Sequence, residues 1–578
     1  MARTIAIGTQ DFGRIIENGC FYVDKTMFIK EWWENQDEVT LITRPRRFGK
    51  TLAMSMLEYF LSVKHAGRGD LFQHLDIWKE EKYRGLQGTF PVIFLSFAGA
   101  KGTNYQTVRK MICQMFVNLY ADFRFLLKGK LSGSADEVFF ERMISSDMDD
   151  ADAALALGQL SRILYQCYGK KTIILLDEYD SPMQEAYAGG YWEQMAGFIR
   201  GIFNSAFKTN PYLERAVLTG VTRISRESVF SDLNSLEAVT SVSEKYETAF
   251  GFTEKETETA LREFGLQEKL SEVKKWYDGF RFGSCVSIYN PWSITQFLDK
   301  GKFAPYWANT SSNRLAGKLI QEGGTDVKRI MEDLLEGKPF CAAVDEQIVF
   351  GELEHNPDAV WSLLLAGGYL KIAGGETENP DFIKGGIVCQ LMLTNLEIVF
   401  TFRKMIRGWF ASCSSSYNDF IKSLLAGDLE GMNGYMNRIA LAVFSSFDAG
   451  NRPSEKSEPE KFYHGFVLGL IVELAGRYEI TSSRESGFGR YDVLLRPRDG
   501  GDGIILEFKV IQPQKEKSLQ ETADAALRQI VDKQYASLLE QSGCGSGDIR
   551  IYGFAFHGKE VLVSGGFLRD YASGRNWR

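Results

Sequence analysis

Short apolar runs alternate with helical spacing over the first part of the chain. The runs are rich in Val, Ile, Leu and Thr, as is typical of buried parallel strands, and lie at residues 39–43, 92–95, 171–176 and 216–221. The apolar positions Leu52, Met56, Leu57 and Phe60 fall at helical spacing, and residues 105–120 form a second predicted helix. This alternation predicts an α/β domain over residues 1–235.

The pattern changes along the rest of the chain. Helical spacing at residues 254–264 and 271–276 predicts a helical lid or winged-helix-like region over residues 236–375. A helical connector and linker are expected over residues 376–455, with the linker stretch rich in Ser, Pro and charge at residues 450–459. Two apolar runs, at residues 490–495 and 504–510, flank a Gly/Asp-rich turn and predict a hairpin in a last domain over residues 456–578.

Composition bounds the class of protein. A chain of 578 residues is expected to form about three domains. With 44% hydrophobic and 25% charged residues it has an ordinary globular composition. No run reaches the length of a membrane span and no signal peptide opens the chain, so we expect a cytoplasmic protein without a membrane partner. Eight cysteines without C-x-x-C pairs and five scattered histidines predict no zinc site.

Residues 44–51 resemble a phosphate-binding loop. The loop pattern is G-x-x-x-x-G-K-[ST], and Gly49, Lys50 and Thr51 match its end. Arg44 replaces the first glycine, and Pro45 removes one backbone donor. Because the motif lies between a predicted strand and a predicted helix, it predicts a nucleotide site. The alternative is a turn in which Thr51 only belongs to the first helical turn.

The apolar run at residues 171–176 is followed by two acids, Asp177 and Glu178. Ligands gather at the carboxyl ends of parallel strands, so Asp177 is placed to hold Mg²⁺ and Glu178 to polarise an attacking water. A strand that simply meets solvent would look the same. After the next run, Thr219 is a candidate sensor of the γ-phosphate and Arg223 a candidate for stabilising transferred charge, although a solvated loop also explains them.

The predicted C-terminal hairpin carries a second set of charged residues. It would bring Asp492 beside Glu507, and Lys509 shares the face of Glu507 because strand periodicity is two. Two hard oxygen ligands and a lysine suit Mg²⁺-dependent attack on a phosphodiester. A solvated strand face is the alternative, but the apolar neighbours Ile504–Leu506 indicate a central strand.

The chain resembles a bacterial AAA-ATPase-like family whose members often carry a C-terminal PD-(D/E)xK nuclease domain. The resemblance rests on residues 22–26, 44–51, 177–180, 250–253, 276–280 and 289–292. It implies an α/β multidomain fold with a P-loop NTPase (AAA-like) domain and a C-terminal α/β PD-(D/E)xK nuclease-like domain. The separation of Lys50 from Asp177 is long for a minimal ATPase and predicts a helical insertion at about residues 98–165. In that family an arginine at the position of Arg44 is usual.

Motif matches to that family extend the set of candidate residues. The nucleotide site would include Arg44, Arg47, Phe48, Gly49, Lys50, Thr51, Asp177, Thr219 and Arg223. Metal ligands would be Thr51 and Asp177 at the nucleotide, and Asp492, Glu507 and a helix residue, Glu460, at the nuclease site. Glu485, Arg490 and Gln529 are expected to contact those ligands or the substrate, although Glu485 could equally be a polar turn residue.

Together these motifs predict an ATP-binding or ATP-hydrolysing protein that cleaves nucleic acid with Mg²⁺. DNA is the expected substrate, and the resemblance suggests defence or mobile-element biology. The net charge of −8 argues against a general nucleic-acid coat, while Lys515, Lys517, Arg528 and Lys533 could form a local groove or a solvated helix face. A homo-oligomer remains open. The alternatives are a nucleotide-dependent switch or scaffold that binds without cleaving, and a decayed mobile-element protein.

Overall fold

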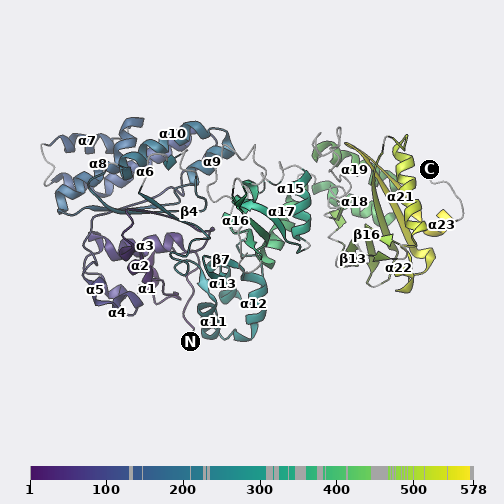
Figure 1. Cartoon of the computed structure of the whole chain (residues 1–578), viewed down its shortest axis with the longest axis horizontal. Coiled ribbons are helices and arrows are strands. Elements are labelled where there is room, and N and C mark those ends of the chain that lie inside the picture. The colour runs from purple at the N-terminus through teal and green to yellow at the C-terminus, as the bar shows by residue number, and fades with distance from the viewer. Residues whose placement is uncertain are drawn as a thin grey trace. The chain divides into compact units, whose positions relative to one another are not determined.

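A computed structural model divides the chain into two compact units (Figure 1). Unit 1 comprises Met1–Leu319 and Gly337–Phe400, and unit 2 comprises Ile320–Glu336 and Thr401–Arg578. The structure describes residues 2–128, 134–145, 148–208, 210–224, 229–230, 235–307, 317, 320, 325–335, 337–344, 359–373, 382–383, 386–411, 414–443, 467–468, 470–471, 474, 477–482, 485–486, 489–490, 492–498, 500–512, 514–542 and 544–572. The division into four domains predicted from the sequence remains a prediction.

A parallel five-stranded sheet forms the centre of unit 1, in the order β2-β3-β4-β1-β5. Its strands are β1 (Val39–Thr43), β2 (Val92–Ser96), β3 (Thr172–Asp177), β4 (Leu213–Gly220) and β5 (Leu236–Val239). Every residue of β1 and β3 is buried, as their continuous apolar sequences predict. Because β4 lies between β1 and β3, the carboxyl ends of all three strands meet at one edge of the sheet.

Helices cover both faces of this sheet (Figure 1). One face carries α1 (Phe12–Glu17), α2 (Met27–Asn35) and α3 (Lys50–Leu61), with α4 (Asp76–Lys79) and α5 (Glu81–Arg84) beyond them. The other carries α6 (Tyr105–Asp122), α7 (Ala135–Ile144), α8 (Asp150–Tyr168), α9 (Ser181–Gly189) and α10 (Trp192–Phe203). α6, α7 and α8 occupy the residues at which the helical insertion is expected.

The region after the parallel sheet contains strands that helical periodicity did not predict. A three-stranded sheet, in the order β6-β8-β7, consists of β6 (Phe252–Thr253), β7 (Phe280–Phe282) and β8 (Cys285–Tyr289). A second sheet consists of β9 (Phe340–Val344), β10 (Leu370–Ile372), β11 (Phe382–Ile383) and β12 (Gly386–Leu393). Most of these strands are too short to show a period in sequence, and pairing with neighbouring strands stabilises them.

Two helices of this region, α11 (Glu254–Glu263) and α12 (Leu270–Tyr277), match their predicted positions. The region also contains α13 (Pro291–Lys300) and α16 (Ala359–Ala366). A capping box formed by Thr253 and Glu256 begins α11, and the Asn290 side chain caps α13. α17 (Leu396–Ala411) follows, and its residues belong to both units because the boundary falls between Phe400 and Thr401.

Unit 2 contains a mixed five-stranded sheet in the order β13-β16-β17-β18-β19. Its strands are β13 (Tyr478–Ser482), β16 (Val493–Pro497), β17 (Gly503–Val510), β18 (Ile549–His557) and β19 (Glu560–Phe567), and a separate pair consists of β14 (Glu485–Ser486) and β15 (Gly489–Arg490). The helices are α15 (Thr325–Leu335), α18 (Ser414–Ala426), α19 (Leu429–Val443), α21 (Leu519–Asp532), α22 (Ser537–Gln541) and α23 (Leu568–Ala572).

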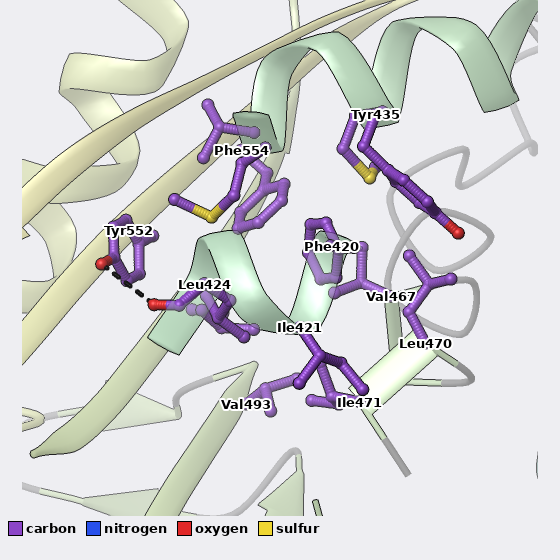
Figure 2. Close-up of a cluster of buried hydrophobic side chains, with 14 of the residues drawn as sticks. Phe420, Ile421, Leu424, Tyr435, Val467, Leu470, Ile471, Val493, Tyr552 and Phe554 are labelled. Carbon is purple, nitrogen blue, oxygen red and sulfur yellow. Dashed lines mark hydrogen bonds between the residues drawn. The ribbon is translucent and has the colours of Figure 1, made fainter. Parts of the chain in front are cut away.

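The two faces of this sheet have different partners. Figure 2 shows Phe420, Ile421 and Leu424 of α18 packed with Phe554 and Val493 from the sheet, with the Tyr552 hydroxyl donating to the Leu424 carbonyl at 3.5 Å. The opposite face packs on α21 and α22 through a cluster that includes Ile505, Leu527 and Leu539. Strand alternation therefore directs the odd-numbered side chains of β17 toward α21.

The helix expected from Glu460 and the linker at residues 450–459 fall outside the described residues, except for parts of residues 467–474. Among the helices that the structure describes, none is long and apolar enough to cross a membrane.

Candidate functional sites

The loop after β1 has the backbone shape of a phosphate cradle. It leads from Thr43 directly into α3 at Lys50. Gly49 adopts a φ of 83° and Arg47 a φ of 68°, so the chain turns through left-handed conformations twice within three residues. The turn brings the N-terminus of α3, where backbone N–H groups and the helix dipole favour anions, to the edge of the sheet.

Lys50 is buried at the base of this loop. Its ammonium donates to the carbonyls of Arg44 and Pro45, each at 2.9 Å. Burial lowers the pKa of Lys50, while the nearby Asp177, Glu178 and Asp180 oppose that change. A lysine charge held among loop carbonyls beside three acids is suited to binding an anion that also carries a metal.

Asp177 lies at the centre of the expected metal-binding group. Its carboxylate is 1% exposed and accepts a hydrogen bond from the Thr51 hydroxyl at 2.8 Å and another from the Thr219 hydroxyl. Burial raises the pKa of Asp177, and the two hydroxyl donors counteract the change. The structure thus brings together three residues that the sequence placed on separate strands and a helix. Thr51 and Asp177 present hard oxygen atoms that fit Mg²⁺.

Glu178 occupies an unusual backbone conformation next to Asp177. Its φ is 51°, which is rare for a residue other than glycine, and its carboxylate accepts a hydrogen bond from the Ser181 hydroxyl at 3.0 Å. Glu178 lines the cavity described below, as its expected role requires. Arg223 follows β4 but does not line the cavity that the described residues form, so its contact with a nucleotide remains only a prediction.

A cavity of about 430 Å³ opens from the loop. Besides Lys50 and Thr51, its walls include residues 5–10, which the sequence analysis did not single out. Trp292 of α13 also lines it, and the Arg47 guanidinium lies 4.4 Å from the centre of that ring. The cavity therefore has a charged end at the loop and walls from the N-terminal segment and α13. Nothing in the sequence pattern of residues 5–10 could have indicated this position.

Arg44 does not face this cavity, contrary to the expected contact with phosphate. Its guanidinium is fully buried and donates to the carbonyls of Thr43 and Thr240, at 2.9 and 2.7 Å. It also lies 4.4 Å from the centre of the Phe282 ring. Burial lowers the pKa of Arg44 to about 9, which leaves the guanidinium charged at neutral pH. The side chain at the first glycine position therefore supports the loop from behind.

Phe48 lines the cavity but also packs behind the loop. Its ring makes edge contacts with Phe280 and Phe282 of β7, with ring centres 4.8 and 5.4 Å apart. Arg44 and Phe48 thus fix the loop onto the β6-β8-β7 sheet. Within this segment, Lys50 and Thr51 face the cavity, whereas Arg44 and Phe48 pack against the β6-β8-β7 sheet.

We expect Arg44→Ala to destabilise unit 1 by about 3 kcal/mol, because two buried carbonyls lose their donor and a cavity replaces the side chain. Urea unfolding of the variant and the wild type measures the difference. Arg14→Ala, at an exposed arginine of α1, is the matched control and should stay within about 0.5 kcal/mol of the wild type. Equal unfolding midpoints for Arg44→Ala and wild type would contradict the supporting role.

A buried carboxylate, Glu397, lies behind the same loop. It accepts hydrogen bonds from the Ser293 hydroxyl at 2.8 Å and the Trp307 backbone N–H at 2.6 Å. Burial raises the pKa of Glu397 from 4.5 to about 7, against the effect of these donors. Tyr277 and Tyr306 interact electrostatically with it, and burial raises the pKa of both.

The raised pKa of Glu397 predicts a pH-dependent stability. Between pH 4.5 and about 7, Glu397 keeps its proton in the folded state but loses it in the unfolded chain. The free energy of unfolding therefore falls as the pH rises through this range. We expect the wild type to lose on the order of 2 kcal/mol relative to Glu397→Gln between about pH 5 and about pH 8. Urea unfolding at the two pH values measures this, and a constant difference between the two proteins would contradict it.

The hairpin of unit 2 brings the second set of residues together. β16 and β17 pair antiparallel, with Val493 opposite Leu506. The Asp492 backbone N–H lies 3.4 Å from the Glu507 carboxylate, and the Phe508 N–H donates to the Asp492 carboxylate at 2.8 Å. Glu507 is 2% exposed although it carries a carboxylate. The predicted adjacency of Asp492 and Glu507 is confirmed.

α21 supplies a partner that holds Glu507. The Gln529 amide donates to the Glu507 carboxylate and lies 3.2 Å from the Tyr535 hydroxyl. Tyr535 is 1% exposed; burial raises its pKa, and Glu507 and Asp492 raise it further. The sequence indicated Gln529 but gave Tyr535 no role of its own. Lys509 is partly exposed. Because it is two residues after Glu507 on β17, it lies on the same face of the strand, toward α21.

The other residues predicted near this hairpin are Glu485, Arg490 and Glu460. Glu485 and Arg490 pair across β14 and β15, and their side chains, like Glu460, fall outside the described residues. In the parts of the chain that the structure describes, no group of three or more His, Cys, Asp or Glu side chains could hold a metal. Asp492 and Glu507 nevertheless fit a hard cation, since they are adjacent carboxylates fixed by backbone and amide donors.

Comparisons with known proteins match both ends of the chain. A family model described as predicted AAA-ATPase matches residues 6–230, and one described as PD-(D/E)XK nuclease superfamily matches residues 458–565. An uncharacterized protein from the vnfD 5′ region of Azotobacter chroococcum mcd 1 is 24% identical over 94% of each chain.

Among solved structures, the ORC2 protein of Aeropyrum pernix is 10% identical to this chain. The match covers 66% of this chain and 92% of the ORC2 chain, at a TM-score of 0.23. The two family matches coincide with the two sites described above. The chain therefore combines an AAA-ATPase-like domain with a C-terminal domain of the PD-(D/E)XK nuclease superfamily.

Proposed function

We propose that this protein binds and hydrolyses ATP with Mg²⁺ in unit 1 and cleaves DNA with Mg²⁺ in unit 2. The observation that carries the proposal is the hairpin arrangement in which Asp492 and Glu507 are adjacent and Gln529 holds Glu507. Burying a carboxylate is costly unless it has partners, and the neighbouring Ile504, Ile505, Leu506 and Phe508 of β17 give no structural need for one. A catalytic role explains why this position is acidic.

At the nucleotide site, each residue has a distinct part in the proposal. Lys50 would bind the outer phosphates, and Thr51 and Asp177 would hold Mg²⁺, since both present oxygen atoms at the loop. Glu178 would orient the attacking water at the wall of the cavity. Its strained backbone is consistent with a functional constraint on the direction of the carboxylate.

At the nuclease site, Asp492 and Glu507 would hold Mg²⁺, with Glu460 as a further ligand. The bound ion supplies Lewis acidity toward the phosphate and a more acidic water. Gln529 keeps the Glu507 carboxylate oriented, and Tyr535 lies beside that amide. Lys509, on the same face of β17, would stabilise the negative charge that develops on the phosphate during attack.

Assays of the purified full-length protein test the proposal. Linear and circular double-stranded DNA, single-stranded DNA and RNA are incubated with Mg²⁺, with and without ATP, and the products are resolved on gels. We expect Mg²⁺-dependent cleavage of DNA and a change in its rate with ATP. The absence of cleavage from every substrate, together with calorimetric binding of Mg²⁺ and ATP, would favour the nucleotide-dependent scaffold.

A further inference from the structure

Two side chains that do not line the cavity, Trp307 and Asn290, contact the loop at residues 44–49. The Arg46 carbonyl accepts a hydrogen bond from the Trp307 indole N–H at 3.0 Å and lies 3.4 Å from the Asn290 amide nitrogen. Trp307 is 1% exposed, so the indole N–H would lose its protein partner only at a cost. The Arg46 side chain lines the cavity and donates to the Gln184 side chain at 3.0 Å. Arg46 therefore contacts Trp307 through its carbonyl and the cavity through its side chain.

Trp307 is also hydrogen-bonded to the first turn of α17. Its backbone N–H donates to Glu397 at 2.6 Å, and the second oxygen of that carboxylate accepts from Ser293 of α13 at 2.8 Å. Glu397 is 1% exposed and lies at the positive end of the α17 dipole. A continuous set of hydrogen bonds therefore runs from the cavity through Arg46 and Trp307 to Glu397.

A bound nucleotide would compete for hydrogen bonds at one end of this set. The Lys50 ammonium donates to the carbonyls of Arg44 and Pro45, which immediately precede the Arg46 carbonyl. A phosphate that attracts the Lys50 ammonium would take its N–H donors away from the Arg44 and Pro45 carbonyls. The backbone next to the Arg46 carbonyl, which Trp307 contacts, would then change its hydrogen bonds. At the other end, α17 continues from unit 1 into unit 2 after Phe400.

We propose that Trp307 and Glu397 are positioning residues that couple nucleotide occupancy of the loop to α17, the helix shared by the two units. The coupling deepens the proposed function, on whose nucleotide site it rests. A ligand shifts such an element only through interactions that differ between its two states, and the hydrogen bonds of residues 44–46 provide that difference. Coupling energies of this kind typically correspond to about 5-fold to 150-fold effects.

Hydrogen exchange of the full-length protein, with and without a non-hydrolysable ATP analogue, tests the coupling. In the wild type we expect the analogue to change amide exchange in the first turns of α17 by about fivefold or more. In Trp307→Phe, which keeps an aromatic ring but removes the indole N–H, that nucleotide-dependent change should be lost. The analogue should still bind, weakened by about tenfold or less, because Lys50 and Thr51 are intact.

Two further variants make the test decisive. Glu397→Ala, which removes both acceptor oxygens, should also abolish the response of α17 and covers the case in which Trp307→Phe fails to fold. Trp78→Phe, at a tryptophan of α4 stacked on Phe72, should respond as the wild type does. A wild type that binds the analogue with no change in α17, or variants that keep the full change, would overturn the coupling. A wild type that binds no nucleotide would overturn the proposed ATP site as well.

Discussion

Replacing Asp492 by Ala together with Lys509 by Ala is expected to abolish nucleic-acid cleavage, with a loss of about a thousandfold or more. Asp492 contributes an oxygen ligand adjacent to Glu507, and Lys509 contributes a positive charge on the same face of β17. Neither side chain belongs to the apolar clusters that pack the sheet, so the fold should persist. Initial rates on labelled DNA at saturating Mg²⁺ measure the effect.

Matched controls separate chemistry from surface charge in this experiment. Asp532→Asn changes an exposed acid at the end of α21, and Lys422→Ala removes a lysine of α18 whose side chain is 70% exposed. Both should cleave at rates close to the wild type. Cleavage that survives in the Asp492 and Lys509 double variant would show that the nuclease chemistry occurs elsewhere. Calorimetry with Mn²⁺ should then reveal whether Asp492 and Glu507 bind a metal at all.

Replacing Lys50 by Ala is expected to weaken ATP binding by about a hundredfold or more. The ammonium is buried at the base of the loop, so its loss removes a positive charge that little solvent screens. An added effect comes from the Arg44 and Pro45 carbonyls, which lose their donor. Isothermal titration of ATP in the presence of Mg²⁺ measures the dissociation constant, and hydrolysis is followed in parallel by phosphate release.

The control for Lys50 is a lysine just beyond the same helix. Lys64→Ala removes a side chain that is 70% exposed and pairs only at 3.5 Å with Glu58, so ATP should bind as it does to the wild type. Thr51→Val should bind ATP with a weaker dependence on Mg²⁺, because the hydroxyl beside Asp177 is gone. Unchanged ATP affinity in Lys50→Ala would exclude the loop as a phosphate site.

Local sequence patterns predicted the elements that carry both sites. The fully buried β1 and β3 follow from continuous apolar runs, and α3 follows from the spacing of Leu52, Met56 and Phe60. Short strands such as β6 and β7 were missed because two or three residues show no period, and helices separate β6 from its pairing partner, β8. The linker and Glu460 lie outside the described residues, so those predictions stand untested.

The sequence alone determined which residues could carry chemistry and which of them share a strand face. Glu507 and Lys509 had to point the same way because strand alternation is a local property of the backbone. Only the tertiary structure decided what each side chain meets. It turned Arg44 away from the cavity, placed Gln529 and Tyr535 beside Glu507, and joined Trp307 to Arg46 across 261 residues. Such contacts depend on how distant segments pack, and a local pattern carries no information about that packing.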